Sequence, residues 1–357
     1  MLRPIRVCFS SAVSSHYKVT YVRATPTALP GSDSSLTVLD ATAIGPDSWL
    51  FQRPAVSALA GKLCERCVSL LDLPADISRG SSTGADEVFC LEYTKEGFVI
   101  RAGDTVEIEP ALLRIPLYAT DFTRYQFRAP ASQCILFPYI VDGDRYHVLD
   151  EHTLRGSFPR AYAYLRDNRS RLQARKQFRE WYGFSAPRNL HVHERVAILV
   201  PLLADRGLFS PAPAEPAAYC VMASAGFSVS FDPIQTAVSR NYLLGLLNSR
   251  LLFWRLASIS NKFRGGWITC TKQYFGTLPI RTRRGTDSRE NALREEVDHL
   301  VQCMLDLHKQ LAASKAPTDK TAIQRQIDAT DRQIDQLVYE LYALTDDEIG
   351  IVEEATG

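Results

Sequence analysis

The chain has 357 residues, which at roughly 100–200 residues per domain suggests about two domains. Hydrophobic residues make up 46% and charged residues 23%, and this composition excludes a wholly disordered, collagen-like or disulfide-packed protein. Lys and Arg number 41 and Asp and Glu 40, so the net charge of +1 alone indicates no polyanionic partner. Because long apolar runs are missing and the cysteines are scattered, we expect a cytoplasmic protein without membrane contact.

Apolar periodicity and turn residues predict alternating strand-rich and helical regions, which is typical of an α+β fold. Residues 1–45 are expected to form one or two strands and a loop, and residues 46–72 a helix. The dipeptide Asp142-Gly143 indicates a hairpin turn between two short strands. The other elements are expected in this order: two strands around a Gly-bearing turn (73–93), several short strands (97–150), helix (151–182), strands with a Pro/Ala-rich loop (193–231), an apolar helix (239–260), and a loop followed by a strand (261–280).

The region from residue 286 onward shows apolar residues at heptad spacing. The two seams are Val297, Leu300, Met304, Leu307 and Leu311, and then Ile323, Ile327, Thr330, Ile334, Leu337 and Leu341. Pro317 lies between them, so two helices that fold back as an antiparallel hairpin are predicted. Such a hairpin can pack on its own domain, and it can also act as a spacer or a subunit contact.

The near-zero net charge hides a separation of charge along the chain. The segment from Arg240 to Arg284 holds nine basic residues and no Asp or Glu. The segment from Arg114 to Arg195 holds fourteen basic residues, thirteen of them Arg, against eight acidic ones, whereas residues 286–357 hold seven basic and sixteen acidic residues. Arg suits bidentate contact with phosphate and guanine, and Tyr and Trp are interleaved with it here. This pattern is typical of a nucleic-acid surface, but outward-facing Arg on a solvated helix would look the same.

Catalytic and metal-binding signatures are missing from the sequence. No Walker loop, GxGxxG, GxSxG or HExxH motif occurs. Cys64 and Cys67 form a single CxxC without a second Cys/His pair, which is a weak zinc signal. His191 and His193 alternate in a segment expected to be a strand, where both would lie on one face without a third ligand. We therefore assign no catalytic or metal-binding residue.

The segment YLLGLLNSRLLFWRLASISNKFRGGWITCTKQYFGTLPI (242–280) and the ending IDQLVYELYALTDDEIGIVEE (334–354) resemble the TaqI-like C-terminal specificity domain. That domain is the target-recognition part of adenine-specific DNA methyltransferases and of type IIG restriction-modification enzymes. The shared features are a helix ending in LLNSxL, KFRGG before an aromatic residue, KQY, LPI and a final LVYELYxLTxxE. Three upstream segments are more loosely similar: ISRGSSTGADEVF (77–89), LLRIPLYATDFTRYQF (112–127) and FPRAYAYLRDNRSRLQAR (158–175).

The resemblance implies a sequence-specific DNA-binding module of a restriction-modification or related phage-defence system. Active relatives carry a Gly-rich S-adenosylmethionine loop and an Asn-Pro-Pro-Tyr motif upstream, and neither occurs in this sequence. The resemblance therefore implies no cofactor in this chain, double-stranded DNA as a partner, and S-adenosylmethionine bound by a separate methyltransferase subunit or domain. The alternatives are a protein-interaction subunit and a non-functional C-terminal fragment of a split methyltransferase gene.

Three domains are expected: a remnant of, or linker from, a methyltransferase domain (1–45), a β-rich target-recognition domain with inserted helices (46–285), and a helical spacer hairpin (286–357). Gly265 and Gly266 would let the backbone approach a phosphate, or would simply serve a sharp turn. The expected DNA-contacting residues are Thr83, Gly84, Arg124, Tyr125, Arg155, Arg166, Arg171, Lys262, Arg264, Gly265, Gly266 and Lys272.

Overall fold

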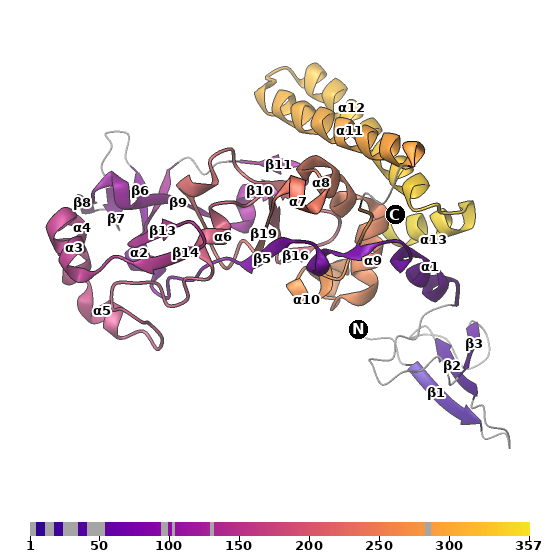
Figure 1. Ribbon diagram of the computed structural model, residues 1–357, viewed down its shortest axis with the longest axis horizontal. Coiled ribbons are helices and arrows are strands. Elements are labelled where there is room, and N and C mark those ends of the chain that lie inside the picture. Colours follow the sequence, from indigo (N-terminus) through magenta and orange to yellow (C-terminus); the bar gives the residue numbers. More distant parts are fainter. Residues whose placement is uncertain are drawn as a thin grey trace. The chain divides into compact units, whose positions relative to one another are not determined.

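The computed structural model describes residues 5–10, 18–23, 35–40, 54–93, 99–101, 104–128, 132–282 and 287–357 (Figure 1). Contacts within the chain divide it into two compact units, Met1–Glu65 and Arg66–Gly357, each of which is described by itself. The second unit contains both extensive sheets and long helices, so the predicted α+β class is confirmed. The domain limits expected at residues 45 and 285 stay predictions.

The first unit contains a three-stranded antiparallel sheet and one helix. Its strands are β1 (Ile5–Ser10), β2 (Lys18–Arg23) and β3 (Ser35–Asp40), with β2 in the middle, and its helix is α1 (Pro54–Cys64). The helix expected over residues 46–72 is wrong at its C-terminal end, because α1 stops at Cys64 and Arg66 adopts a left-handed φ of 57°. Its first residues, 46–53, lie outside the described residues.

Two sheets form the β-rich part of the second unit. The larger has six strands in the order β18-β9-β12-β6-β7-β8 and is antiparallel except where β18 meets β9. Its strands are β6 (Cys90–Tyr93), β7 (Val99–Arg101), β8 (Asp104–Val106), β9 (Leu113–Leu117), β12 (Gln133–Leu136) and β18 (Tyr219–Val221). The smaller is antiparallel in the order β17-β15-β19-β5, with β5 (Ala75–Arg79), β15 (Ile198–Val200), β17 (Ser210–Pro211) and β19 (Phe227–Phe231).

Short antiparallel pairs complete the β structure. β13 (Tyr139–Asp142) and β14 (Arg145–Val148) form the predicted hairpin, and Gly143 in its turn has a positive φ of 57°. The other pairs are β4 (Val68–Ser69) with β21 (Pro279–Ile280), β10 (Phe122–Thr123) with β11 (Gln126–Phe127), and β16 (Leu203–Ala204) with β20 (Ile268–Thr269).

Three helices, α3 (Glu151–Ser157), α4 (Pro159–Asp167) and α5 (Arg169–Gln173), occupy the helical region predicted over residues 151–182. Each of them packs into the core of the β-rich part, where Leu154, Leu165 and Leu172 are fully buried. The opposite side chains of these helices are polar, so the inserted helices have one face in the core and one in solvent.

The strand expected around His191 and His193 is instead a one-turn helix, α6 (Leu190–His193). Asn189 before it adopts a left-handed φ of 43°, which turns the chain out of an extended path. The two imidazoles therefore do not share a strand face, and the next strand begins only at Ile198. His193 is buried, and its Nδ1 lies 2.8 Å from the Ser228 hydroxyl.

The single apolar helix expected over residues 239–260 is two helices, α8 (Arg240–Asn248) and α9 (Arg250–Ile259). Ser249 separates them with an extended backbone, φ −64° and ψ 151°. Its hydroxyl accepts a hydrogen bond from the Leu252 amide at 3.2 Å, so it caps α9 instead of continuing α8. Two one-turn helices flank the pair, α7 (Pro233–Thr236) before it and α10 (Lys272–Phe275) after it.

The C-terminal region forms the predicted antiparallel hairpin of α11 (Ser288–Ala313) and α12 (Pro317–Leu341), followed by α13 (Asp346–Thr356). Val297 and Met304 of α11 and Ile327 and Ile334 of α12 are buried, as the heptad seams predict. α11 packs against α8, and α12 and α13 pack against α9, so the hairpin rests on the apolar helix pair. Within the described ranges, no helix combines the length and the apolar character needed to cross a membrane.

Candidate nucleic-acid interface

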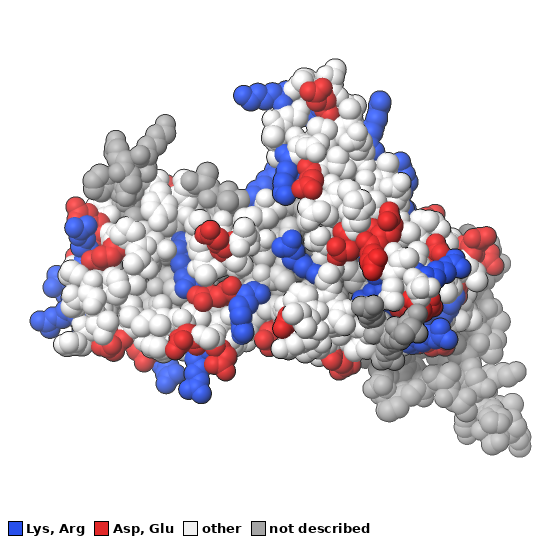
Figure 2. All heavy atoms as spheres, turned by 45° about the horizontal axis from the view of Figure 1, so that its top comes forward, with Lys and Arg blue, Asp and Glu red and all other residues white. Residues whose placement is uncertain are grey.

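Part of the charge separation along the sequence is neutralised by ion pairs between the basic and acidic segments. Three Arg of the basic segments pair with carboxylates of the acidic C-terminal region: Arg124 with Asp331, Arg250 with Asp335, and Arg281 with Glu290. On the face seen in Figure 2, basic and acidic side chains are interspersed and do not form two large separate areas. Charge counts by segment therefore overstate the basic surface.

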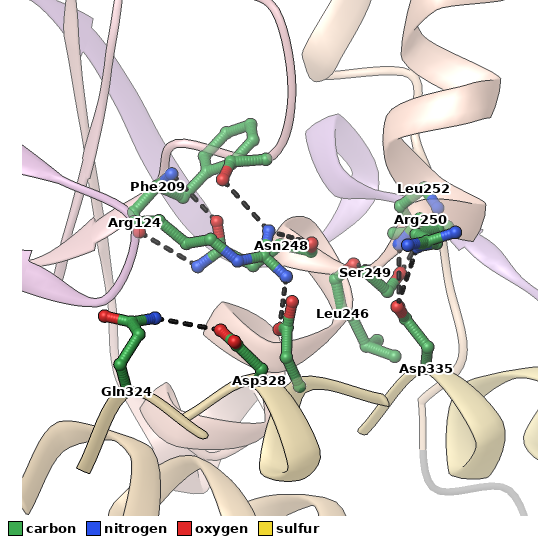
Figure 3. A network of polar contacts seen from close by, with 12 residues as sticks. Arg124, Phe209, Leu246, Asn248, Ser249, Arg250, Leu252, Gln324, Asp328 and Asp335 are labelled. Carbon is green, nitrogen blue, oxygen red and sulfur yellow. Dashed lines mark hydrogen bonds and ion pairs between the residues drawn. The ribbon is translucent and has the colours of Figure 1, made fainter. Parts of the chain in front are cut away.

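Arg124 lies in the turn between β10 and β11 and points into the protein (Figure 3). Its Nη1 donates to the carbonyls of Gly207 at 3.0 Å and Asn248 at 2.5 Å, and its Nη2 donates to Asp331 on α12. Tyr125 beside it is 2% exposed, and its hydroxyl has no hydrogen-bond partner within the described part of the chain. Neither side chain is free to contact DNA, so these two expected contacts are structural residues.

Asp335, one turn after Asp331, completes this connection between α12 and the α8–α9 break. It accepts a hydrogen bond from the Arg250 backbone amide at 2.8 Å, and the Arg250 side chain lies 3.5 Å away. Burial raises the pKa of Asp335 to about 6, although the Arg250 amide and two Arg side chains act in the opposite direction.

Thr83 and Gly84 form a tight turn that hydrogen bonds within the protein hold in place. The Thr83 side chain has no exposed surface, and its hydroxyl donates to Asp86 and accepts from the Ala85 amide. Arg175 donates to the Thr83 carbonyl at 2.8 Å and holds the turn against the core. Gly84 is exposed with a φ of 72°, and an added Cβ would come within 2.0 Å of the Ser185 hydroxyl. The expected contact through Thr83 is therefore corrected to a structural role.

Lys272 also serves the fold, because its Nζ donates to the Ile77 carbonyl at 3.1 Å and ties α10 to β5. Lys262 is exposed, at the neck of a loop that Arg264, Gly265 and Gly266 close as a short 3₁₀ turn. Lys272 is itself exposed, so of the five residues expected in this motif one is tied to β5 at the surface and four belong to the adjacent loop. We call Asn261–Trp267 the 261–267 loop.

Arg155, Arg166 and Arg171 are all exposed, on α3, α4 and α5 respectively. The last two belong to a wider group of exposed cations, named here the α4–α5 surface: Arg166, Arg169, Arg171, Lys176 and Arg179. Between residues 166 and 179 the sequence holds one carboxylate, Asp167, which lies 3.4 Å from Arg166. Exposed positive charge therefore outweighs negative charge in this region.

Three exposed aromatic residues accompany these cations and were absent from the expected contacts. Phe178 is 38% exposed beside the α4–α5 surface, and Phe263 and Trp267 are 54% and 39% exposed in the 261–267 loop. Two features of the sequence could have indicated this exposure. Phe178 is a single aromatic residue in the charged run KQFRE, and Phe263 and Trp267 lie on either side of two glycines. Together with the cations they form two places where positive charge and aromatic rings reach solvent together.

The described residues contain no group of three or more His, Cys, Asp or Glu side chains arranged to hold a metal ion. Burial raises the pKa of the Cys134 and Cys220 thiols to about 12, so neither is a thiolate at neutral pH. Burial likewise lowers the pKa of His193 to about 4, which keeps this imidazole neutral. No protein-family model matches the chain, and a search of curated proteins finds no match either.

Proposed function

We propose that this chain is a DNA-binding specificity module that positions a separate adenine-N6 DNA methyltransferase on its site. The observation that carries the proposal is the α4–α5 surface, where five exposed cations lie close in sequence with one carboxylate. Ion pairs inside the fold hold Arg124 and Arg281, whereas these five residues are exposed. Such a local excess of positive charge creates a potential that attracts a polyanion.

Arg and Lys on this surface would bind phosphates and release counterions from the duplex. Phosphate contacts fix position, so sequence would be read by other side chains, and the 261–267 loop is the second exposed basic region. The partner would bind S-adenosylmethionine and carry out methyl transfer, because this sequence lacks the Gly-rich loop and the Asn-Pro-Pro-Tyr motif. The assignment to restriction-modification or phage defence rests on the resemblance of the C-terminal motifs.

The test is the salt dependence of binding to duplex DNA, measured by fluorescence anisotropy. We expect the wild-type affinity to fall steeply as salt is raised, with a log–log slope of about −0.9 for each phosphate contacted. The triple variant Arg171→Gln, Lys176→Gln, Arg179→Gln should lower that slope by about 2 to 3 and weaken binding to all sequences. An unchanged slope in this variant, or wild-type binding that ignores salt, would contradict the proposal.

A matched control changes three exposed cations of the acidic hairpin: Lys320→Gln, Arg325→Gln and Arg332→Gln. It removes the same number of charges and should leave DNA binding nearly unchanged, because the field around these residues is dominated by carboxylates. The same variant also tests the alternative that the chain is a protein-interaction subunit. Loss of methyltransferase-subunit binding in the hairpin variant, together with no DNA binding by the wild type, would favour that alternative.

A further inference from the structure

The 261–267 loop is a narrow hairpin that holds two aromatic side chains in solvent. Three backbone contacts close it: the Thr269 amide donates to Asn261 at 3.1 Å, Lys262 bridges Ile268, and the Phe263 amide donates to Trp267 at 2.7 Å. Phe263 and Trp267 thus face each other across the neck, with three residues between them. Neither ring packs against another aromatic ring within the described part of the chain.

The tip of the loop is shaped by the backbone conformation of two glycines and does not pack against the rest of the protein. Gly265 and Gly266 have φ values of 79° and 84°, which side chains other than glycine rarely adopt. An added Cβ at Gly266 would meet nothing within 4 Å, and at Gly265 it would meet only the edge of the Trp267 ring at 3.7 Å. The two glycines are therefore required for the turn and leave the space around the rings open.

The charge around the loop favours a polyanion over an apolar protein surface. Lys262 is exposed at the neck, and no carboxylate occurs between residues 240 and 284 of the sequence. β20 continues the loop and pairs with β16, where Leu203 adds a third apolar side chain that is 39% exposed. The turn after β16 carries one charge of each sign, Asp205 and Arg206, so it leaves the basic balance unchanged.

We propose that Phe263 and Trp267 stack on a nucleobase that is displaced from the DNA helix, while Lys262 contacts an adjacent phosphate. This inference rests on the proposed DNA binding, and it names the contact that the loop makes. Every base has a flat apolar face, and stacking on an aromatic side chain is a strong, sequence-tolerant interaction. Exposed apolar side chains can also insert between base steps, and Phe263 and Trp267 are such a pair.

The experiment compares three labelled duplexes with the full-length chain: a perfect duplex, one with a single bulged adenine, and one with a bulged abasic residue. We expect the bulged adenine to bind tighter than the abasic bulge, because the two differ only in the base. Trp267→Ala should remove this preference and weaken binding to the bulged adenine by about 5- to 100-fold. Trp267→Phe, which keeps an aromatic ring, should retain most of it.

Tyr93→Ala is the matched control, because Tyr93 on β6 is as exposed as Trp267 but lies outside the loop and outside the α4–α5 surface. It should leave the preference for the bulged adenine intact. Equal binding of the adenine and abasic bulges by the wild type overturns the inference and leaves the DNA-binding proposal standing. A uniform loss in Trp267→Ala on all three duplexes also overturns it, whereas wild-type failure on every duplex contradicts both proposals.

Discussion

The guanidinium of Arg124 donates to the carboxylate of Asp331, a residue 207 positions further along the chain. This ion pair joins the β10–β11 turn to α12, and the same guanidinium holds the carbonyls of Gly207 and Asn248. One side chain therefore connects the β-rich part of the second unit, the apolar helix pair and the hairpin. A cation in such a place stabilises the fold only while all its partners are present.

Replacing Arg124 by Met is expected to lower the free energy of unfolding by about 3 kcal/mol, because it leaves Asp331 unpaired and two carbonyls without a donor. Urea unfolding followed by circular dichroism measures this. Arg166→Met is the control, since Arg166 pairs with Asp167 on the surface and should change stability by less than about 0.5 kcal/mol. Equal losses in the two variants would show that Arg124 is not a buried tie.

Asp335 is expected to make the protein less stable as the pH rises from about 4 to 6. Burial raises its folded-state pKa from 3.8 to about 6, so the folded protein binds the proton more tightly than the unfolded chain in this window. Its ionisation therefore costs up to about 3 kcal/mol above pH 6 and nothing below pH 4. Asp335→Asn, which still offers an oxygen to the Arg250 amide, should gain stability over the wild type at pH 7 and lose that gain at pH 4.

His193 is expected to change the pH dependence of stability in the opposite direction to Asp335. Burial lowers its folded-state pKa from 6.5 to about 4, so the unfolded chain binds the proton more tightly between these values. The wild type should therefore gain about 3 kcal/mol from this residue as the pH rises from 4 to 6.5. Denaturant titrations across this range should show a shallower rise for His193→Gln, whereas the exposed His147→Gln should follow the wild type.

Gly84→Ala is expected to be much more harmful than Gly143→Ala, although both glycines have a positive φ. The strain of a left-handed alanine, about 1 kcal/mol, is common to both. At Gly84 the new Cβ would also come within 2.7 Å of the Ser185 Cβ, whereas at Gly143 it would meet nothing within 4 Å. Thermal melts should therefore show a clearly larger drop for Gly84→Ala, and equal drops would mean that the Thr83–Gly84 turn can move away.

Elements with a strong local pattern could be predicted from the sequence. The heptad seams gave both helices of the C-terminal hairpin, and Asp142-Gly143 gave the β13–β14 turn. The errors arose where one residue overrides a pattern. Ser249 divides an otherwise continuous apolar helix by capping α9, and Asn189 turns an alternating segment into the one-turn α6. Such overrides depend on a single hydrogen bond or φ angle, which composition over a window does not reveal.

The candidate surface was predictable only in part, because a sequence shows which residues are charged and not which ones meet. Arg124 and Thr83 were expected at DNA and are internal, whereas Lys272 is exposed but donates to the Ile77 carbonyl. Arg166, Arg171 and Lys262 are exposed, as a contact role requires. Phe263 and Trp267 lie next to charged residues and glycines that were expected to contact DNA. Only their exposure to solvent in the structure identifies these two aromatic residues as further candidates.

The break at Ser249 fixes the register of the C-terminal hairpin. Because α8 ends there, the Asn248 carbonyl is free for Arg124 and the Arg250 amide is free for Asp335. Asp331 and Asp335 are spaced by about one helical turn and meet the break from its two sides. Inserting one residue into α12 before this pair would rotate the helix by about 100°, and neither carboxylate would then reach its partner. The contacts at this break thus admit a single alignment of α12 against α8 and α9.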